Sequence, residues 1–435
     1  MKLSSMLIGA CSVLALTATA QAETITIATV NNGDMVRMQG LTADFTAKNP
    51  GIELEWVTLE ENILRQRVTT DVATNGGQFD VMTIGTYEVP IWAKQGWLVP
   101  LTALQNDAAY DADDILPAIA GGLSVDGKLY AAPFYGESSM VMYRTDLMEK
   151  AGLSMPDAPT WDFIADAARK MTNRDEGING ICLRGKAGWG ENGAFLTAMS
   201  NSFGARWFDE DWNAQFDQPE WKATLDFYVG LMNDAGPAGA SSNGFNENLA
   251  LFQQGKCGMW IDATVAASFV TSGDSTVADK VGFALAPDNG LGKRANWLWA
   301  WSLAIPSGSQ KQDAAAKFVS WATDKAYLEL VASKEGWAAV PPGTRTSLYE
   351  NPEYLAAAPF AQMTLDSINA ADPTNPTVKP VPYVGVQFVA IPEFQGIANN
   401  VGQQFAAALA GTKTVDEALA EAQLITTREM RAAGY

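Results

Sequence analysis

The N-terminal part of the chain alternates between short apolar runs and segments in which apolar residues recur every three or four positions. Alternating apolar residues such as Ile25 and Ile27 are typical of a strand. The spacing of Met35, Met38 and Leu41 is typical of an amphipathic helix. The predicted order is strand 24–30, helix 35–48, strand from 52, helix 63–73 and strand 79–84. Two strand–helix–strand crossovers in succession predict a parallel sheet with right-handed connections.

Polar side chains follow each of these three predicted strands. Ligands of open α/β sheets bind beyond the carboxyl ends of the strands, so these residues are the first candidates for a site. They are Asn31, Asn32 and Asp34 after the first strand, Glu60, Glu61 and Asn62 after the second, and Thr86, Tyr87 and Glu88 after the third. Amides and carboxylates suit the binding of hydroxyl groups. The first of these sets is not the glycine-rich G-x-G-x-x-G that binds nucleotide phosphates, so we do not expect a nucleotide.

The composition excludes several kinds of chemistry. The 435 residues include no histidine, which removes Ser-His-Asp and Cys-His catalysis and imidazole zinc sites. With 29 basic and 49 acidic residues the net charge is −20, which disfavours nucleic acid and anionic lipid as partners. Hydrophobic residues make up 47% and charged residues 18%, so a large folded core is expected. Three cysteines exclude a disulfide-rich scaffold or a cysteine-rich metal site, and we expect no cofactor and no metal.

Residues 1–22 have the pattern of a secretory signal peptide. Lys2 provides the basic start, residues 6–18 form an apolar stretch, and residues 20–22 (AQA) match a small-x-small cleavage site. We therefore predict cleavage after Ala22 and export to the periplasm. A buried helix is the alternative interpretation. Cys11 loosely resembles a lipoprotein cysteine, but the apolar run before it is too short for that assignment.

Two cysteines, Cys182 and Cys257, remain after that cleavage. Two remaining cysteines usually pair in an oxidising compartment, and both lie in strand-like runs. We predict a disulfide between them. It closes a loop of about 75 residues, which corresponds to about 4 kcal/mol in the loop-entropy model. Two separate buried thiols are the alternative.

Five blocks, in order along the chain, resemble the extracellular solute-binding proteins of sugar ABC importers. They are residues 75–81 (NGGQFDV), 127–133 (GKLYAAP), 141–147 (VMYRTDL), 160–163 (TWDF) and 252–260 (FQQGKCGMW). The spacing matches over nearly the whole chain after the signal. The resemblance implies an α/β fold of two lobes, each a mainly parallel sheet flanked by helices, with a ligand cleft between them. It also implies a binding protein and not an enzyme, with a membrane permease as its partner and a monomer as its state.

Other segments resemble the polyol branch of that family, the sorbitol- and mannitol-binding proteins. They are residues 86–90 (TYEVP), 134–139 (FYGESS), 182–185 (CLRG), 260–264 (WIDAT) and 341–345 (PPGTR). Maltose-type relatives usually carry G-x-x-P-x-R near the last segment, whereas here two extra residues and a double proline follow Gly336 and Trp337. The resemblance therefore implies a sugar alcohol as ligand. A mono- or oligosaccharide is the alternative.

The same resemblance implies where the lobes divide. Crossings are expected near Pro133, Ser302 and Pro341. Lobe one then comprises residues 23–133 plus 303–341, and lobe two comprises residues 134–302 plus 342–435. A hinge motion between them is expected to enclose the ligand.

A sugar alcohol combines hydroxyl groups that donate and accept with apolar C–H edges. Carboxylates, amides and arginine can match the hydroxyls, and indole faces can cover the edges. Trp297, Trp299 and Trp301 alternate and so share one face of a predicted strand, although each could simply pack the core. Structural alternatives exist for others too: Asp262 could cap a helix, and Arg184 could pair with a surface carboxylate. The selected candidates are Asn32, Tyr87, Glu88, Tyr135, Glu137, Arg184, Trp260, Asp262, Trp299, Trp301, Trp337 and Arg345.

An exported glycosidase is the second class of function to consider. It would need two carboxylates about 5–9.5 Å apart, which a chain without histidine can supply. No series of blocks here resembles a glycosidase, so we predict no catalytic residues. A scaffold or adhesion protein is not supported, because the sequence has no repeats and no low-complexity arms.

Overall fold

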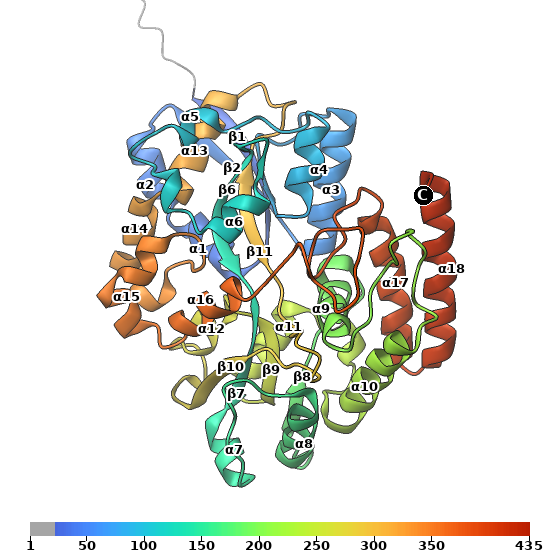
Figure 1. The fold of residues 1–435 in the computed structure, drawn as a ribbon. Helices are drawn as coiled ribbons and strands as arrows, with labels where there is room; N and C mark the ends of the chain where they lie inside the picture. The colour runs from blue at the N-terminus through green and yellow to red at the C-terminus, as the bar shows by residue number, and fades with distance from the viewer. Residues whose placement is uncertain (1–21) are drawn as a thin grey trace, which may run out of the picture.

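Two β-sheets, placed one above the other in Figure 1, organise the part of the chain that the computed structural model describes, residues 22–435. The first sheet has the strand order β2-β1-β3-β11-β6, with β1 (Glu23–Val30), β2 (Ile52–Leu59), β3 (Val81–Ile84), β6 (Ala131–Glu137) and β11 (Trp299–Ala304). The second has the order β10-β7-β9-β8, with β7 (Ser139–Arg144), β8 (Asn179–Cys182), β9 (Cys257–Ala263) and β10 (Val281–Leu285). A small hairpin pairs β4 (Ser124–Val125) with β5 (Lys128–Leu129).

Helices cover both faces of the first sheet. In Figure 1, α3 (Glu61–Thr74) and α4 (Glu88–Lys94) lie on one side, and α2 (Thr42–Lys48), α13 (Gln312–Thr323) and α14 (Lys325–Glu335) on the other. The shorter α1 (Gly33–Gly40), α5 (Thr102–Gln105) and α6 (Pro117–Gly122) complete this group. We call the first sheet and these helices the first lobe.

The second sheet is flanked by helices in the same way. Those that follow its strands are α7 (Thr145–Lys150), α8 (Trp161–Met171), α9 (Ala194–Ser202), α10 (Pro219–Ala235), α11 (Phe245–Gln253) and α12 (Ala266–Val270). The C-terminal α17 (Phe394–Leu409) and α18 (Val415–Ala433) pack against each other and on α10, at the right of Figure 1. We call this group the second lobe. The two helix-flanked sheets confirm the predicted α/β class.

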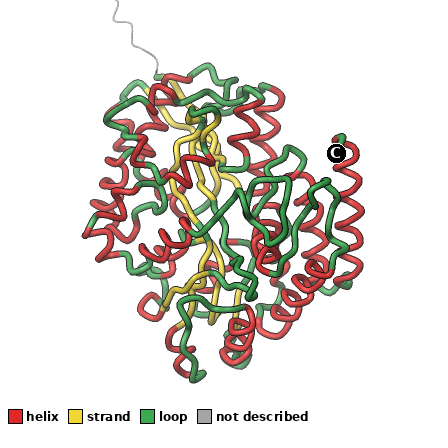
Figure 2. Tube along the Cα trace, in the orientation of Figure 1, coloured by secondary structure: helices red, strands yellow, loops and turns green. Residues whose placement is uncertain are grey.

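The remaining C-terminal segments connect the two groups. α15 (Pro352–Ala357) follows the first lobe, and α16 (Ala361–Asn369) packs on β6, β7 and β10. Residues 370–393 then form an irregular segment of turns, drawn as a loop in Figure 2, before α17 begins.

The predicted N-terminal elements are confirmed with one difference. β1 pairs in parallel with β2 and with β3, as the two crossovers require. The single predicted helix 35–48 is two helices, because α1 ends at Gly40 and α2 begins at Thr42. α3 begins after Glu60, whose carboxylate accepts a hydrogen bond of 3.1 Å from the backbone N–H of Asn62.

Strand pairing elsewhere is mixed, where mainly parallel sheets were expected. β11 runs antiparallel to β3 and β6, and β7 runs antiparallel to β9 and β10, while β8 and β9 are parallel. The reason is the path of the chain between the sheets. β7 enters the second sheet directly from β6, and β11 returns from the second sheet to the first, so each runs against its neighbours.

The ends of the strands show where the chain passes between the sheets. Only Ser138 separates β6 from β7, and residues 286–298 connect β10 to β11. Pro133 and Ser302, near which crossings were expected, pair with each other within the first sheet. The segment after Pro341 lies beside β6, since Gly136 N–H donates to the carbonyl of Pro342 at 2.9 Å.

The predicted disulfide between Cys182 and Cys257 is confirmed. It links the end of β8 to the start of β9, and both cysteines are fully buried. The predicted signal peptide lies outside the described residues, apart from Ala22. Over residues 22–435, no helix has both the length and the apolar character that crossing a membrane requires.

Candidate functional site

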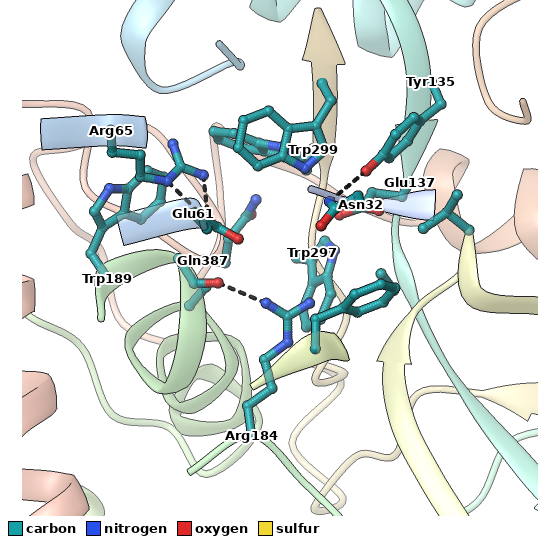
Figure 3. Close-up of a pocket in the computed structure, with 16 residues that line it drawn as sticks. Asn32, Glu61, Arg65, Tyr135, Glu137, Arg184, Trp189, Trp297, Trp299 and Gln387 are labelled. Carbon is teal, nitrogen blue, oxygen red and sulfur yellow. Dashed lines mark hydrogen bonds and ion pairs between the residues drawn. The ribbon is translucent and has the colours of Figure 1, made fainter. Parts of the chain in front are cut away.

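A cavity lies between the two lobes, and both contribute side chains to it (Figure 3). About 460 Å³ of space there is free of protein atoms, including space that is open to solvent. The lining residues are Asn32, Glu61, Arg65, Tyr135, Glu137, Arg184, Trp189, Gly190, Ala194, Phe245, Ala263, Val265, Trp297, Trp299, Trp301 and Gln387.

Arg184 enters the cavity from the second lobe, just beyond the end of β8. Its guanidinium donates to the Asp262 carboxylate from Nε (2.9 Å) and Nη2 (2.7 Å), and from Nη1 to the carbonyl of Gly190 (2.7 Å). Burial lowers the pKa of Arg184, but the carboxylates of Asp262 and Glu191 outweigh burial and hold that pKa above its ordinary value. The arginine therefore stays charged. Because these bonds use three of its five N–H groups, others remain for a bound molecule.

Arg65 and Glu61 enter the cavity from the first turns of α3. Arg65 donates to Glu61 Oε1 from Nε (2.9 Å) and Nη2 (2.7 Å), and also pairs with the buried Glu88. Its guanidinium lies over the rings of Trp189 at 4.0 Å and Trp301 at 4.7 Å. These contacts fix Glu61, a carboxylate that can accept hydrogen bonds from a ligand.

Indole rings form the apolar part of the wall. Trp299 packs edge-on against Trp301 with ring centroids 5.5 Å apart, and against Trp189 at 5.6 Å. Trp297 also lines the cavity, so the three tryptophans that alternate in the sequence reach it together, as their shared face predicts. Flat, rigid rings of this kind cover C–H edges at a low cost in conformational entropy.

Glu137 and Tyr135 belong to β6, on the side of the cavity opposite Glu61 in Figure 3. The hydroxyl of Tyr135 accepts a hydrogen bond of 2.9 Å from the amide of Asn32. Burial raises the pKa of Glu137 to about 8, although the nearby Arg184 opposes this shift. The carboxyl group is therefore able to donate as well as to accept near neutral pH.

Six of the twelve candidates from the sequence line this cavity. They are Asn32, Tyr135, Glu137, Arg184, Trp299 and Trp301. Several of these six residues lie at or just after the carboxyl ends of strands, where ligands of open α/β sheets bind.

Four candidates lie behind the lining residues and do not reach the cavity. Trp260 and Asp262 are fully buried in β9, where the indole N–H donates to Asp262 at 3.1 Å. Glu88 pairs with Arg65, and Tyr87 donates its hydroxyl hydrogen to the carbonyl of Ile391 at 3.0 Å. In this structure these residues contact lining residues and do not themselves line the cavity, and a role for them in ligand binding stays a prediction.

Trp337 and Arg345 are placed elsewhere in the fold. The indole N–H of Trp337 donates to Glu353 at 2.6 Å. Arg345 is buried, donates to the carbonyls of Asp111 (2.8 Å) and Thr323 (3.0 Å), and lies over the ring of Tyr110. Both lie close in sequence to Pro341, near which a crossing was expected, whereas the segment after Pro341 lies beside β6 of the first sheet.

Several lining residues were not selected from the sequence. Glu61 was named among the residues that follow the second predicted strand, but it was not among the twelve selected. Arg65 lies one helical turn after Glu61, a spacing that allows an i,i+4 ion pair. Gln387 gives no such signal. It lies in the irregular segment, and its amide donates to the carbonyl of Leu298 at 2.8 Å and accepts from the N–H of the same residue at 3.3 Å.

The two lobes and the cavity between them define a solute-binding protein. Residues 32–329 match the family described as bacterial extracellular solute-binding proteins, and the chain belongs to this family. The predicted resemblance is confirmed, and the family consists of binding proteins found outside the cytoplasmic membrane.

Two proteins similar to this chain are described as binding, or as containing, mannitol. The chain is 56% identical over 434 residues to the mannitol-binding protein of Pseudomonas aeruginosa strain PAO1, which covers 100% of this chain and 99% of that protein. It is 75% identical to an ABC transporter solute-binding protein of Agrobacterium vitis S4, whose crystal structure contains bound D-mannitol. That structure matches with a TM-score of 0.95 and covers 95% of this chain and 100% of that chain.

A third similar structure is a solute-binding protein of Agrobacterium radiobacter K84 in complex with ribitol. It is 24% identical, with a TM-score of 0.83 over 94% of this chain and 99% of that chain. At this identity the likeness concerns the fold alone. Together with the A. vitis structure it confirms the predicted two-lobe fold.

Proposed function

We propose that this protein captures a sugar alcohol, with D-mannitol as the first candidate, and delivers it to the permease of an ABC importer. The observation that carries the proposal is the composition of the cavity: charged groups that can bind hydroxyls stand beside a wall of indole rings. The mannitol-binding relative of P. aeruginosa and the mannitol complex of A. vitis support the same ligand.

Each part of a hexitol finds a matching group in the cavity. Arg184 and Asn32 supply N–H donors, and Glu61 supplies an acceptor. Glu137, with its raised pKa, can donate or accept. Trp299 and the rings beside it face the C–H edges. Every hydroxyl that is buried without a partner costs about 1–3 kcal/mol, so the positions of these groups select among stereoisomers.

Closure of the lobes is part of this proposal. The ligand shifts an open–closed equilibrium by its differential affinity for the two states. The division into residues 23–133 plus 303–341 and 134–302 plus 342–435 stays a prediction, and the strand ends favour moving two of its borders to Ser138 and to residues 286–298. Export by a signal peptide cleaved after Ala22 and a monomeric state belong to the same proposal.

The proposal includes release of the ligand without chemical change. Glu61 and Glu137 are two carboxyl groups in one cavity, so turnover must be tested as well as binding. After incubation of the protein with D-mannitol, or with maltose, we expect to recover the same molecule. Recovery of a cleaved sugar would favour the glycosidase.

A thermal-shift titration of the chain from Glu23 onward tests the ligand. The panel is mannitol, sorbitol, arabitol, ribitol, xylitol, glucose and maltose. A ligand at 100 times its dissociation constant adds about 2.7 kcal/mol of stability, so a rise in Tm with mannitol is expected. A shift with maltose and none with polyols would keep the fold and discard the polyol. No shift with any compound would contradict the proposal.

A further inference from the structure

A short segment of the second lobe docks on the first turns of α3 in the first lobe. Lys186 Nζ lies 2.6 Å from Glu60 Oε1. The amide of Asn62 donates to the carbonyl of Ala187 at 3.2 Å, and the ring of Trp189 lies 4.0 Å from the Arg65 guanidinium. We call residues 186–190 and 60–65 together the latch. It is separate from the strands through which the chain passes between the sheets.

Glycines let the two sides of the latch approach each other. A Cβ atom on Gly188 would collide with the Asn62 side chain, and one on Gly190 would collide with the Glu61 carboxylate. The carbonyl of Gly190 also accepts the hydrogen bond from Arg184. One continuous segment therefore contacts both the arginine of the second lobe and the carboxylate of the first.

The latch has an inner and an outer part. Trp189, Gly190, Glu61 and Arg65 line the cavity, whereas Lys186, Glu60 and Asn62 are not among its lining residues. The side chains of Lys186 and Glu60 are 28% and 34% exposed. The outer part can therefore change without altering the surface that a ligand touches.

We propose that the outer contacts of the latch, chiefly the Lys186–Glu60 ion pair, set the affinity for the ligand by stabilising the closed arrangement of the lobes. Their atoms come from different lobes, so a motion that separates the lobes at this point breaks them. The apparent dissociation constant equals the intrinsic one divided by the closed fraction. Any residue that favours closure thus tightens binding from outside the cavity. This inference rests on the proposed function.

Glu60→Gln is the cleanest variant. Glutamine keeps the oxygen that accepts from the N–H of Asn62 at the start of α3, and it removes the charge that pairs with Lys186. Lys186 is less suitable alone, since it also lies 3.8 Å from the buried Glu191. The matched control is Asp234→Asn, which removes an exposed ion pair of 2.8 Å with Arg169 inside the second lobe.

Calorimetric titration with D-mannitol measures the effect. For Glu60→Gln we expect affinity about 2- to 5-fold weaker and mainly faster dissociation. In a double-mutant cycle, adding Lys186→Gln to Glu60→Gln should cost less than Lys186→Gln does alone. Asp234→Asn should bind like the unaltered protein.

Salt provides a readout that a purely structural role does not move. D-mannitol carries no charge, so a salt dependence of its affinity reports charges between the lobes. Raising NaCl to about 1 M, where the Debye length is about 3 Å, should weaken binding to the unaltered protein and change Glu60→Gln much less. If Glu60→Gln and the unaltered protein have equal affinity and equal salt dependence, the proposed role of the latch is wrong. Failure of the unaltered protein to bind any polyol would overturn the proposed function itself.

Discussion

Asp262 holds the guanidinium of Arg184 through hydrogen bonds of 2.9 Å to Nε and 2.7 Å to Nη2, and it has no surface exposed to solvent. The arginine lines the cavity and the aspartate does not. Asp262 is thus a positioning residue, which fixes the direction in which the remaining N–H groups of Arg184 point.

Asp262→Asn should weaken binding of D-mannitol tenfold or more, because the arginine loses the charge and the second acceptor that orient it. It should also lower Tm in the absence of ligand, since breaking a buried ion pair typically costs about 3–5 kcal/mol. Calorimetry and thermal unfolding check the two effects separately. Arg184→Lys keeps the positive charge but loses the planar guanidinium with its paired N–H donors, so this variant should also bind D-mannitol weakly. Unchanged affinity in both variants would contradict the assignment of this site.

The disulfide should be visible in solution. In the chain from Glu23 onward, thiol titration after unfolding without reductant should detect no free thiol, and after reduction it should detect Cys182 and Cys257. Cys257→Ser should lower the free energy of unfolding by about 4 kcal/mol, as the loop-entropy model predicts. Detection of two thiols before reduction would refute the bridge.

Three buried carboxyl groups should make stability depend on pH. Burial raises the pKa of Asp34 to about 6 and that of Glu137 to about 8, and it raises the pKa of Glu191 as well. The folded state then keeps protons that the unfolded state has already released. Between the ordinary carboxyl pKa and pH 8, the free energy of unfolding should therefore fall as pH rises.

Urea unfolding without ligand at several pH values measures this slope. Each retained proton contributes about 1.4 kcal/mol per pH unit, so Glu137→Gln should reduce the slope by up to that amount. Asp114 and Asp146, whose pKa values are lowered, act below this window and serve as a contrast. A flat profile from pH 5 to 8 would exclude the retained protons.

Arg345 and Trp337 should affect binding differently from the lining residues. Arg345→Met should lower Tm, since it leaves the carbonyls of Asp111 and Thr323 without their buried donor. Its affinity for D-mannitol should stay within twofold of the unaltered protein. Trp337→Phe should change affinity equally little. A tenfold loss of affinity in either variant would contradict the assignment of the cavity as the ligand site.

Local patterns predicted β1, β2 and β3 of the first sheet well, because apolar alternation in β1 and β2 and the stop at residues 48–51 depend on near neighbours. They also placed Trp299 and Trp301 on one face. They did not show that β11 joins this sheet antiparallel to β3. They could not show that Tyr87 and Glu88, although they follow β3, are covered by Trp189 and Arg65 from other segments. Nor could they show Gln387, whose position depends on pairing with Leu298.

The single residue between β6 and β7 has a mechanical consequence. Glu137 immediately precedes Ser138, where the chain passes from one sheet to the other, while Glu61, a residue of the latch, lies across the cavity in Figure 3. Both carboxyl groups therefore belong to the first lobe, and a ligand that contacts them joins the two lobes only through its contacts with second-lobe residues such as Arg184.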